Sequence, residues 1–417
     1  MPSAVRPGRR PSTARALPAV LVLALGLTLT TAACSGSEDA AAPSGPGGTP
    51  TPVDDGAPGA STVASGETTA AAESATASVA ESATPTRTCP AAASLPLRQR
   101  LQQTLMVWAD GSAGSVPGVL TNPDVLIGGV FVGGNDTAGL EAGEFAALAE
   151  RPVPPLVAVD DEGGQVQRID GVVGDMPSAE DQADGMTPAE VRGMARDRGR
   201  ALAELGITVD LAPVVDLNDG DSGGVIGDRA YSDDPDVVVD YAGAFARGLQ
   251  QAGILPTLKH FPGHGRAQGD SHQTLPTTPP WASVQAQDLL PYEALLDRPG
   301  PWAVMVGHLV VPGLTTEGRP ASLDPAVYRY LREDLGFDGL VMTDELSGMK
   351  AVSASYGPAD AAAAALAAGA DLLLMAAPGD LTELLDRLET QVIAGELSEQ
   401  RVTDAADHVL AAKTCRP

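Results

Sequence analysis

Residues 255–261, "LPTLKHF", form a short and mostly apolar run that carries Lys259 and His260 near its end. A short run of this composition is typical of a β-strand. Its apolar residues are nearly continuous rather than alternating, which suits a strand covered on both faces, as in a parallel sheet. The stretch therefore predicts a buried strand that delivers two polar side chains at its end.

Seven other runs of this kind repeat along the chain, separated by helical patterns rich in Ala and Leu. Two of these patterns, 188–206 and 235–253, begin near Pro or Asp and stop at Gly, as helices tend to. Repeated β/α units predict the α/β class and a single closed (β/α)8 TIM-type barrel, with a doubly wound open sheet as the alternative. The further predicted strands are residues 104–110, 126–132, 156–161, 208–216, 303–309, 339–345 and 371–377.

Polar residues gather at the ends of these predicted strands. A barrel builds its active site at the C-terminal ends of several strands, so the pattern predicts an active site there. Capping of helices or turns would explain one or two such residues but not all of them. The residues concerned are Asp160, Asp161, Asp216, Lys259, His260, His308 and Asp344.

The chain begins with a segment that is typical of export. Four arginines and no acid precede an apolar run over residues 16–33, and Cys34 follows it. "TTAAC" is similar to a bacterial lipoprotein cleavage box, although Thr31 stands where many such boxes have Leu. We expect residues 1–34 to be a signal peptide with Cys34 as the lipidated residue, and a retained membrane anchor is the alternative. The protein would then lie at the extracytoplasmic face of the cell membrane, lipid-anchored or secreted.

Residues 35–88 consist mostly of Ala, Ser, Thr, Gly, Pro and Glu with almost nothing to bury, so we expect a disordered linker. Residues 89–417 are long enough for one large domain. Cys89 and Cys415 bracket that domain, and in an exported protein such a pair is usually a disulfide. The bridge would bring the ends of the domain together, which favours the barrel; two unrelated thiols are the alternative.

The charge balance limits the partners. The formal net charge is −28 and the pI is about 4.3. A surface this acidic repels nucleic acid and anionic membranes, so neither is expected as a direct partner. A membrane contact is expected only through the lipid anchor.

The histidines after residue 259 raise the question of a metal. His260 and His264 have the spacing of two zinc ligands on a helix, but Pro262 and Gly263 between them would break that helix. No Glu follows the first His as in H-E-x-x-H, so no metal site is predicted and His264 is expected to be structural.

A pair for proton transfer lies just beyond. Asp270 and His272 are two residues apart, and such residues point to the same side of an extended chain. Asp270 could hold one imidazole nitrogen while the other gives and takes a proton near neutral pH. An incidental surface pair is the alternative.

Other candidates suit a neutral, hydroxyl-rich ligand. Asp344, at the end of an apolar strand, is either a nucleophile or a buried structural acid, and Glu345 should point to the other side. Lys259, Arg229 and Arg168 could donate hydrogen bonds to such a ligand.

Five segments occur here in the order that is typical of glycoside hydrolase family 3 β-N-acetylhexosaminidases, and the chain resembles that family over residues 89–417. The family's "KHFPGHG" and Asp–x–His loop distinguish it from family 3 β-glucosidases. The segments are "AVDDEGGQVQR" (158–168), "VIGDRAY" (225–231), "KHFPGHG" (259–265), "DSHQTLP" (270–276) and "GFDGLVMTDEL" (336–346).

The resemblance implies a role for each matched residue. Asp344 corresponds to the nucleophile, His272 to the general acid/base and Asp270 to its partner. No metal or organic cofactor is implied, and a monomer is expected. The residues implied to bind the sugar are Asp160, Arg168, Arg229, Lys259 and His260.

The resemblance implies a retaining exo-enzyme that removes terminal β-linked N-acetylglucosamine (GlcNAc) from cell-wall fragments. A β-glucosidase and a GlcNAc phosphorylase are the alternatives within the enzyme class. A sugar-binding lipoprotein without catalysis is the alternative from another class.

Overall fold

A computed structural model describes residues 89–218 and 225–413 of the chain. The expectations for residues 1–34, for the linker 35–88 and for Cys415 fall outside these residues. None of the helices within the described residues is long and apolar enough to cross a membrane.

Eight parallel strands form the centre of the domain, in the order β10-β1-β2-β3-β6-β7-β8-β9. A bridge between Met342 and Leu372 links the two outer strands, so the sheet nearly closes on itself. Each strand lies inside one of the eight predicted runs, and the predicted barrel is confirmed. The strands are β1 (Leu105–Ala109), β2 (Gly129–Val132), β3 (Leu156–Val159), β6 (Val209–Asp210), β7 (Leu255–Phe261), β8 (Ala303–Val306), β9 (Leu340–Thr343) and β10 (Leu373–Met375).

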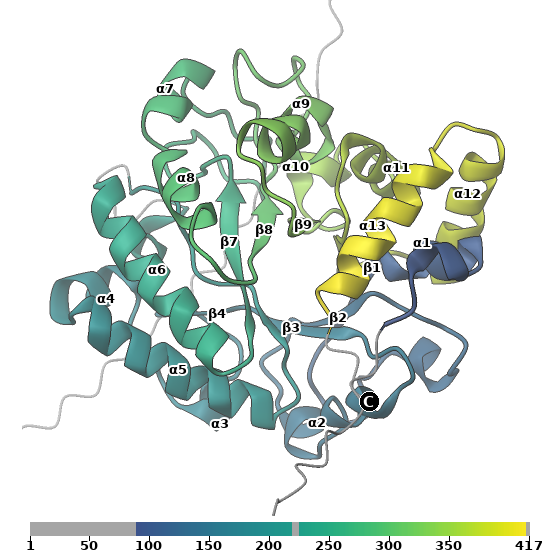
Figure 1. The fold of residues 1–417 in the computed structure, drawn as a ribbon, viewed down its shortest axis with the longest axis horizontal. Coiled ribbons are helices and arrows are strands. Elements are labelled where there is room, and N and C mark those ends of the chain that lie inside the picture. The colour runs from purple at the N-terminus through teal and green to yellow at the C-terminus, as the bar shows by residue number, and fades with distance from the viewer. Residues whose placement is uncertain (1–88, 219–224, 414–417) are drawn as a thin grey trace, which may run out of the picture. The chain divides into compact units, whose positions relative to one another are not determined.

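Helices surround the strands (Figure 1). A small antiparallel pair, β4 (Asp161–Gly163) and β5 (Val166–Gln167), follows β3. The helices are α1 (Leu97–Gln103), α2 (Ala138–Glu141), α3 (Asp170–Val173), α4 (Ala179–Gly185), α5 (Pro188–Glu204), α6 (Pro235–Gln251), α7 (Trp281–Ala286), α8 (Leu290–Leu296), α9 (Pro325–Arg329), α10 (Lys350–Ser353), α11 (Pro358–Ala368), α12 (Leu381–Ile393) and α13 (Glu399–Ala411).

Local sequence signals define the long helices α5 and α6. Thr187 and Glu190 form a capping box at the start of α5, and the Asp234 carboxylate accepts a hydrogen bond from the Asp236 N–H at the start of α6. The two helices approach closely at Gly248, where a Cβ atom would lie 2.5 Å from the Arg192 carbonyl oxygen. The close approach therefore requires glycine.

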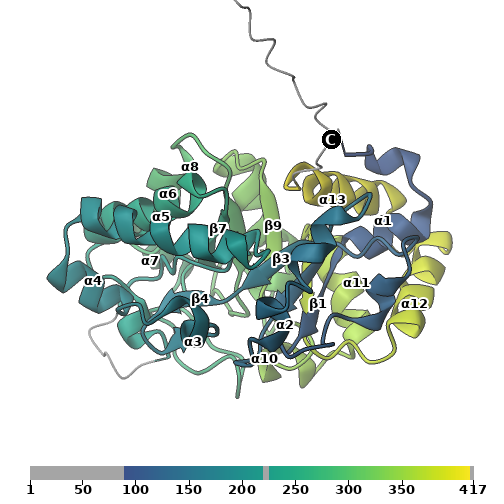
Figure 2. The same cartoon turned by 90° about the horizontal axis from the view of Figure 1, so that it is seen from below.

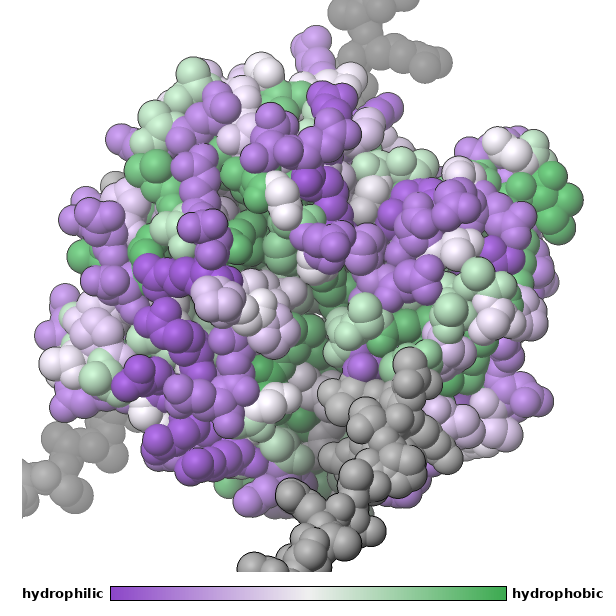
Figure 3. All heavy atoms as spheres, in the orientation of Figure 1, coloured by the Kyte–Doolittle hydropathy of each residue, from purple (hydrophilic) through white to green (hydrophobic). Residues whose placement is uncertain are grey.

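Two apolar layers account for the continuous hydrophobicity of the strands. Met106, Phe131 and Met305 belong to a cluster that includes residues of all eight strands, and a larger cluster includes strand residues such as Val107 together with residues of the surrounding helices. Each strand is thus buried on both faces, as predicted. Hydrophilic side chains cover much of the outer surface on the face shown in Figure 3.

The two ends of the described domain meet. Helices α1 and α13 lie side by side in both views (Figure 1 and Figure 2), and strand β1 pairs with β10. Arg100 forms an ion pair with Glu399 at 2.6 Å, and the Ala92 N–H donates to Asp407 Oδ1 at 2.7 Å. The predicted Cys89–Cys415 bridge requires the two ends to lie close together, and they do. The bridge itself stays a prediction.

Candidate active site

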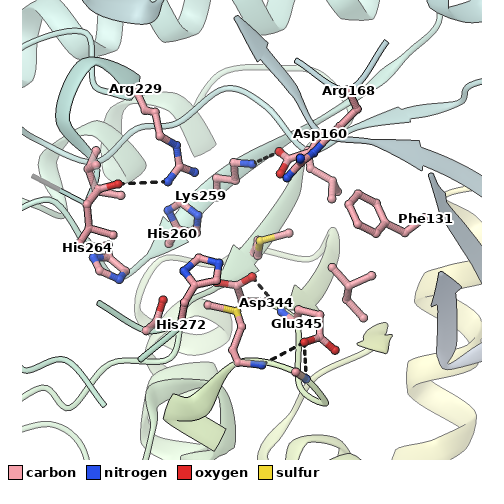
Figure 4. A pocket seen from close by; sticks show the side chains of 18 residues that line it. Phe131, Asp160, Arg168, Arg229, Lys259, His260, His264, His272, Asp344 and Glu345 are labelled. Carbon is pink, nitrogen blue, oxygen red and sulfur yellow. Dashed lines mark hydrogen bonds and ion pairs between the residues drawn. The ribbon is translucent and has the colours of Figure 1, made fainter. Parts of the chain in front are cut away.

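A cavity of about 330 Å³ opens at the C-terminal ends of the strands (Figure 4). Among the residues that line it are seven of the predicted site residues, which are Asp160, Arg168, Arg229, Lys259, His260, His272 and Asp344. The eighth, Asp270, contacts His272. Residues that are up to 184 positions apart in the sequence are therefore brought together as the barrel predicts.

Lys259 lies between two carboxylates at the end of β7. Its Nζ is 2.5 Å from Asp160 Oδ1 and 2.5 Å from Glu162 Oε1. Burial disfavours the ammonium, but the two carboxylates outweigh this effect and raise the pKa of Lys259 above its ordinary value. Lys259 is therefore a fixed cation on the cavity wall.

Glu162 binds a second cation as well. Its carboxylate accepts two hydrogen bonds from the Arg229 guanidinium, at 2.7 and 2.8 Å, in a bidentate pair. Burial opposes charge on Glu162, but Arg229 and Lys259 outweigh it and hold the pKa of this carboxyl well below its ordinary value. Glu162 was not predicted as a site residue. The available signal was its place directly after the strand-ending Asp160 and Asp161.

Asp216 holds His260 in place. Its Oδ2 is 2.7 Å from His260 Nδ1, and its Oδ1 accepts a 2.6 Å hydrogen bond from the His264 N–H. Burial raises the pKa of Asp216, but His260 and His264 outweigh this effect and the net pKa is lowered. Asp216 was predicted only as a strand-ending polar residue, and its contacts add the function of orienting His260.

The predicted pair of Asp270 and His272 is present on the loop after β7. His272 Nδ1 lies 3.0 Å from Asp270 Oδ1, which also accepts a 2.9 Å hydrogen bond from the His272 N–H. Burial raises the pKa of Asp270, but these hydrogen bonds and one from Gln273 outweigh it and lower the pKa. The His272 side chain is 69% exposed, so its other nitrogen is open to the cavity mouth.

Asp344 follows β9 and faces the same cavity (Figure 4). Its Oδ1 accepts a 2.8 Å hydrogen bond from the Glu345 N–H. Burial raises the pKa of Asp344, but His308, His260, this N–H group and Lys259 outweigh it and hold the pKa below its ordinary value. The carboxylate is therefore ionised at neutral pH, as a nucleophile requires.

Glu345, the residue after Asp344, binds backbone N–H groups of the surrounding loops. Its carboxylate accepts hydrogen bonds from the N–H groups of Ser347, Gly348, Met349 and Ala376, at distances between 2.5 and 3.2 Å. These contacts fix the loop beside Asp344.

Two other strand-ending residues are structural in their contacts. The buried Asp161 pairs with Arg198 at 2.6 Å, and His308 contacts Ser322 Oγ at 2.7 Å and the Glu345 carbonyl oxygen at 2.8 Å. Neither residue lines the cavity, and neither caps a helix through these contacts, so the capping alternative does not describe them.

Within the described residues, no group of three or more His, Cys, Asp and Glu side chains is placed to hold a metal ion. The rings of His260 and His264 instead lie edge to face, with centroids 5.8 Å apart. The cavity is thus lined by cations, imidazoles and carboxylates that can bind a hydroxyl-rich molecule and move a proton.

A model of the glycosyl hydrolase family 3 N-terminal domain matches residues 96–412. The chain belongs to glycosyl hydrolase family 3. It is 43% identical to the beta-hexosaminidase LpqI of Mycobacterium tuberculosis over 361 residues, which cover 82% of this chain and 92% of that relative.

Solved structures agree with the family assignment. M. tuberculosis LpqI matches with a TM-score of 0.74 and 42% identity, covering 80% of this chain and 99% of that one. A family 3 beta-N-acetylglucosaminidase from Paenibacillus matches with a TM-score of 0.71 and 32% identity, covering 77% of this chain and 63% of that one. The family and the enzyme class indicated by the sequence, a glycoside hydrolase, are confirmed.

Proposed function

We propose that this family 3 chain is a retaining exo-β-N-acetylglucosaminidase that removes terminal β-linked GlcNAc from peptidoglycan fragments. Relatives that cover most of the chain are named beta-hexosaminidases or beta-N-acetylglucosaminidases. The observation that carries the proposal is one cavity that holds an ionised carboxylate, Asp344, and an imidazole paired with a carboxylate, His272 with Asp270.

The proposed reaction has two steps. In the first, an Asp344 oxygen attacks the anomeric carbon, the bond to the leaving oxygen breaks, and His272 donates its proton to that oxygen. In the second, His272 takes a proton from water, the resulting hydroxide attacks the anomeric carbon, and the Asp344 carboxylate leaves. Two displacements retain the anomeric configuration.

His272 replaces the carboxylic acid of the general two-carboxylate scheme, so the separation of two carboxyl groups does not predict the stereochemistry here. Asp270 orients His272 through the contact with its Nδ1, which leaves Nε2 for the proton transfer. Because a neutral imidazole does not repel an anion, phosphate could replace water in the second step, which makes a GlcNAc phosphorylase the second candidate.

The terminal sugar binds to a wall of the cavity that is formed by three parts of the chain. These are the ends of β3 and β7 and the segment around Arg229. Lys259 and Arg229 are held by Glu162 and offer donors in fixed positions, and His260 is oriented by Asp216. Asp160 and Arg168 complete the set. Pre-set donors of this kind bind a neutral, hydroxyl-rich ring without reorganisation.

The test is hydrolysis of an aryl β-GlcNAc by the wild type and by the variants Asp344→Asn and His272→Ala. We expect near-total loss of activity for Asp344→Asn. The loss for His272→Ala should shrink when the leaving group is already acidic, because such a group departs without a proton. Full activity of Asp344→Asn would refute the mechanism.

The same assay separates the alternatives. An aryl β-glucoside should be hydrolysed far more slowly than the aryl β-GlcNAc, and added phosphate should leave the product as free GlcNAc rather than GlcNAc 1-phosphate. A protein that binds GlcNAc but leaves every aryl glycoside intact would be a sugar-binding lipoprotein.

We further propose that residues 1–34 direct export, that Cys34 carries the lipid, that Cys89 and Cys415 form a disulfide, and that the protein is a monomer. The support is the sequence pattern together with the meeting ends of the domain. Cys34→Ala should move the protein from the membrane fraction to the medium. Peptide maps of the mature protein with and without reductant should differ by the Cys89–Cys415 peptide pair.

A further inference from the structure

His264 is a buried residue of the cavity wall that no step above uses. It is 3% exposed, and neither Nδ1 nor Nε2 has a hydrogen-bond partner among the residues that the structure describes. Its ring lines the cavity together with the rings of His260 and His272 (Figure 4). Buried polar groups are almost always satisfied, so two buried and unpartnered nitrogens of a residue that lines a binding cavity call for an explanation.

The position of His264 is fixed by its surroundings. Its N–H group donates to Asp216 at 2.6 Å. Both neighbours are glycines in tight contact, since a Cβ atom would lie 2.5 Å from Asp288 Cβ at Gly263 and 1.7 Å from the Leu217 carbonyl oxygen at Gly265. The backbone on each side of His264 is therefore tightly packed and requires glycine at both positions.

The ring is suited to a neutral partner. Burial and the neighbouring His260 lower the pKa of His264, although Asp216 and Asp344 act in the opposite direction. A neutral imidazole has one N–H donor and one nitrogen acceptor. A hydroxyl group both donates and accepts, so it matches this pair better than a carboxylate or a phosphate does.

We propose that His264 is a substrate-binding residue that forms a hydrogen bond with a hydroxyl group of the terminal sugar in this cavity. The inference rests on the proposed function, because it takes the ligand to be a sugar. It differs from the sequence-based expectation that His264 is purely structural. An unpartnered imidazole destabilises the empty protein, and the bound sugar supplies the partner.

The first test compares stability with activity for His264→Leu and His264→Gln. Leucine has about the volume of histidine and no polar atom, so we expect His264→Leu to raise the melting temperature of the free protein. We also expect it to lower kcat/KM for an aryl β-GlcNAc by roughly tenfold, the cost of about one lost hydrogen bond. His264→Gln should recover part of the activity, because it keeps a donor and an acceptor.

A buried histidine with both nitrogens partnered is the control. His308→Leu removes an imidazole that contacts Ser322 and the Glu345 carbonyl, so its melting temperature should fall. If His264→Leu also lowers the melting temperature and reduces activity only in proportion to folded protein, His264 is structural and the inference is wrong. If the melting temperature rises and kcat/KM stays at the wild-type value, the inference is wrong as well.

A second test identifies the hydroxyl group. Aryl β-GlcNAc substrates that lack the 3-, 4- or 6-hydroxyl are assayed with the wild type and with His264→Leu. For one deoxy substrate, kcat/KM of the wild type should fall by about the factor by which His264→Leu lowers kcat/KM for the full substrate. In His264→Leu, kcat/KM for that deoxy substrate should equal kcat/KM for the full substrate. Equal losses in both enzymes for all three substrates would overturn the inference. Absence of any hydrolysis by the wild type would instead contradict the proposed function.

Discussion

Replacing Glu162 with Gln removes one charge from the cavity wall while keeping the shape of the side chain. In the wild type, Lys259 and Arg229 are balanced by Glu162 and Asp160, two cations against two carboxylates. In Glu162→Gln, one buried positive charge is left without its partner. The amide also presents an NH₂ group where Arg229 and Lys259 both require an acceptor.

The magnitude follows from the burial of the pair. The Glu162 side chain is 3% exposed and the Lys259 side chain 2%. Removing one partner of a buried ion pair costs about 3–5 kcal/mol of folding free energy. Because Lys259 keeps Asp160, we expect a loss near the lower end, about 3 kcal/mol. At about 2 °C per kcal/mol for a large domain, the melting temperature should fall by about 6 °C.

The assay is thermal unfolding together with kinetics on an aryl β-GlcNAc. Misplacement of Lys259 and Arg229 should lower kcat/KM by at least tenfold beyond any loss of folded protein. Asp360→Asn is the control, because it removes the partner of Arg387 in an exposed pair and should change the melting temperature by less than about 1 °C. A Glu162→Gln protein with the melting temperature and kcat/KM of the wild type would refute the reasoning.

Three other measurements follow from the site and its surroundings. Asp216→Asn should lower kcat/KM by about tenfold, with most of the change in KM, because His260 loses the carboxylate that orients it; an unchanged KM would speak against that function. The pKa of Asp344 lies below its ordinary 3.8, so kcat/KM should not fall through protonation of this group until the pH is below about 4, and the acid side of the wild-type pH profile checks this. Burial and the nearby Arg151 lower the pKa of Lys413 to about 7 from 10.5, so the unfolded chain binds a proton that the folded chain lacks between these values. Lys413→Met should therefore raise the melting temperature relative to the wild type more at pH 6 than at pH 9, and an equal change at both values would contradict the shift.

The barrel could be predicted because its signals are local. Each strand is a short apolar run, and five of the eight runs carry the polar residues of the predicted active site at their ends, so the eight strands and the cavity at their C-terminal ends follow from the pattern. The pair Asp270 and His272 was also within reach, since two residues in one loop need no knowledge of the rest of the fold.

The partners of the binding residues could not be read in the same way. Glu162 meets Arg229 across 67 positions, and Asp216 meets His260 across 44. Which carboxylate pairs with which cation depends on the order of strands around the barrel and on side-chain direction at each strand end. The same limit applies to two residues that are adjacent in the sequence. Asp161 binds Arg198 on α5, whereas Asp160 faces the cavity.

The meeting ends of the domain also fix the place on the barrel where the preceding part of the chain joins it. Cys89 packs against a cluster that includes Leu126 and Val153, which lie just before β2 and β3, so the described chain begins at the amino ends of the strands. The cavity opens at the opposite ends. The segment that precedes Cys89 therefore joins the domain at the end of the barrel that lies away from the cavity mouth.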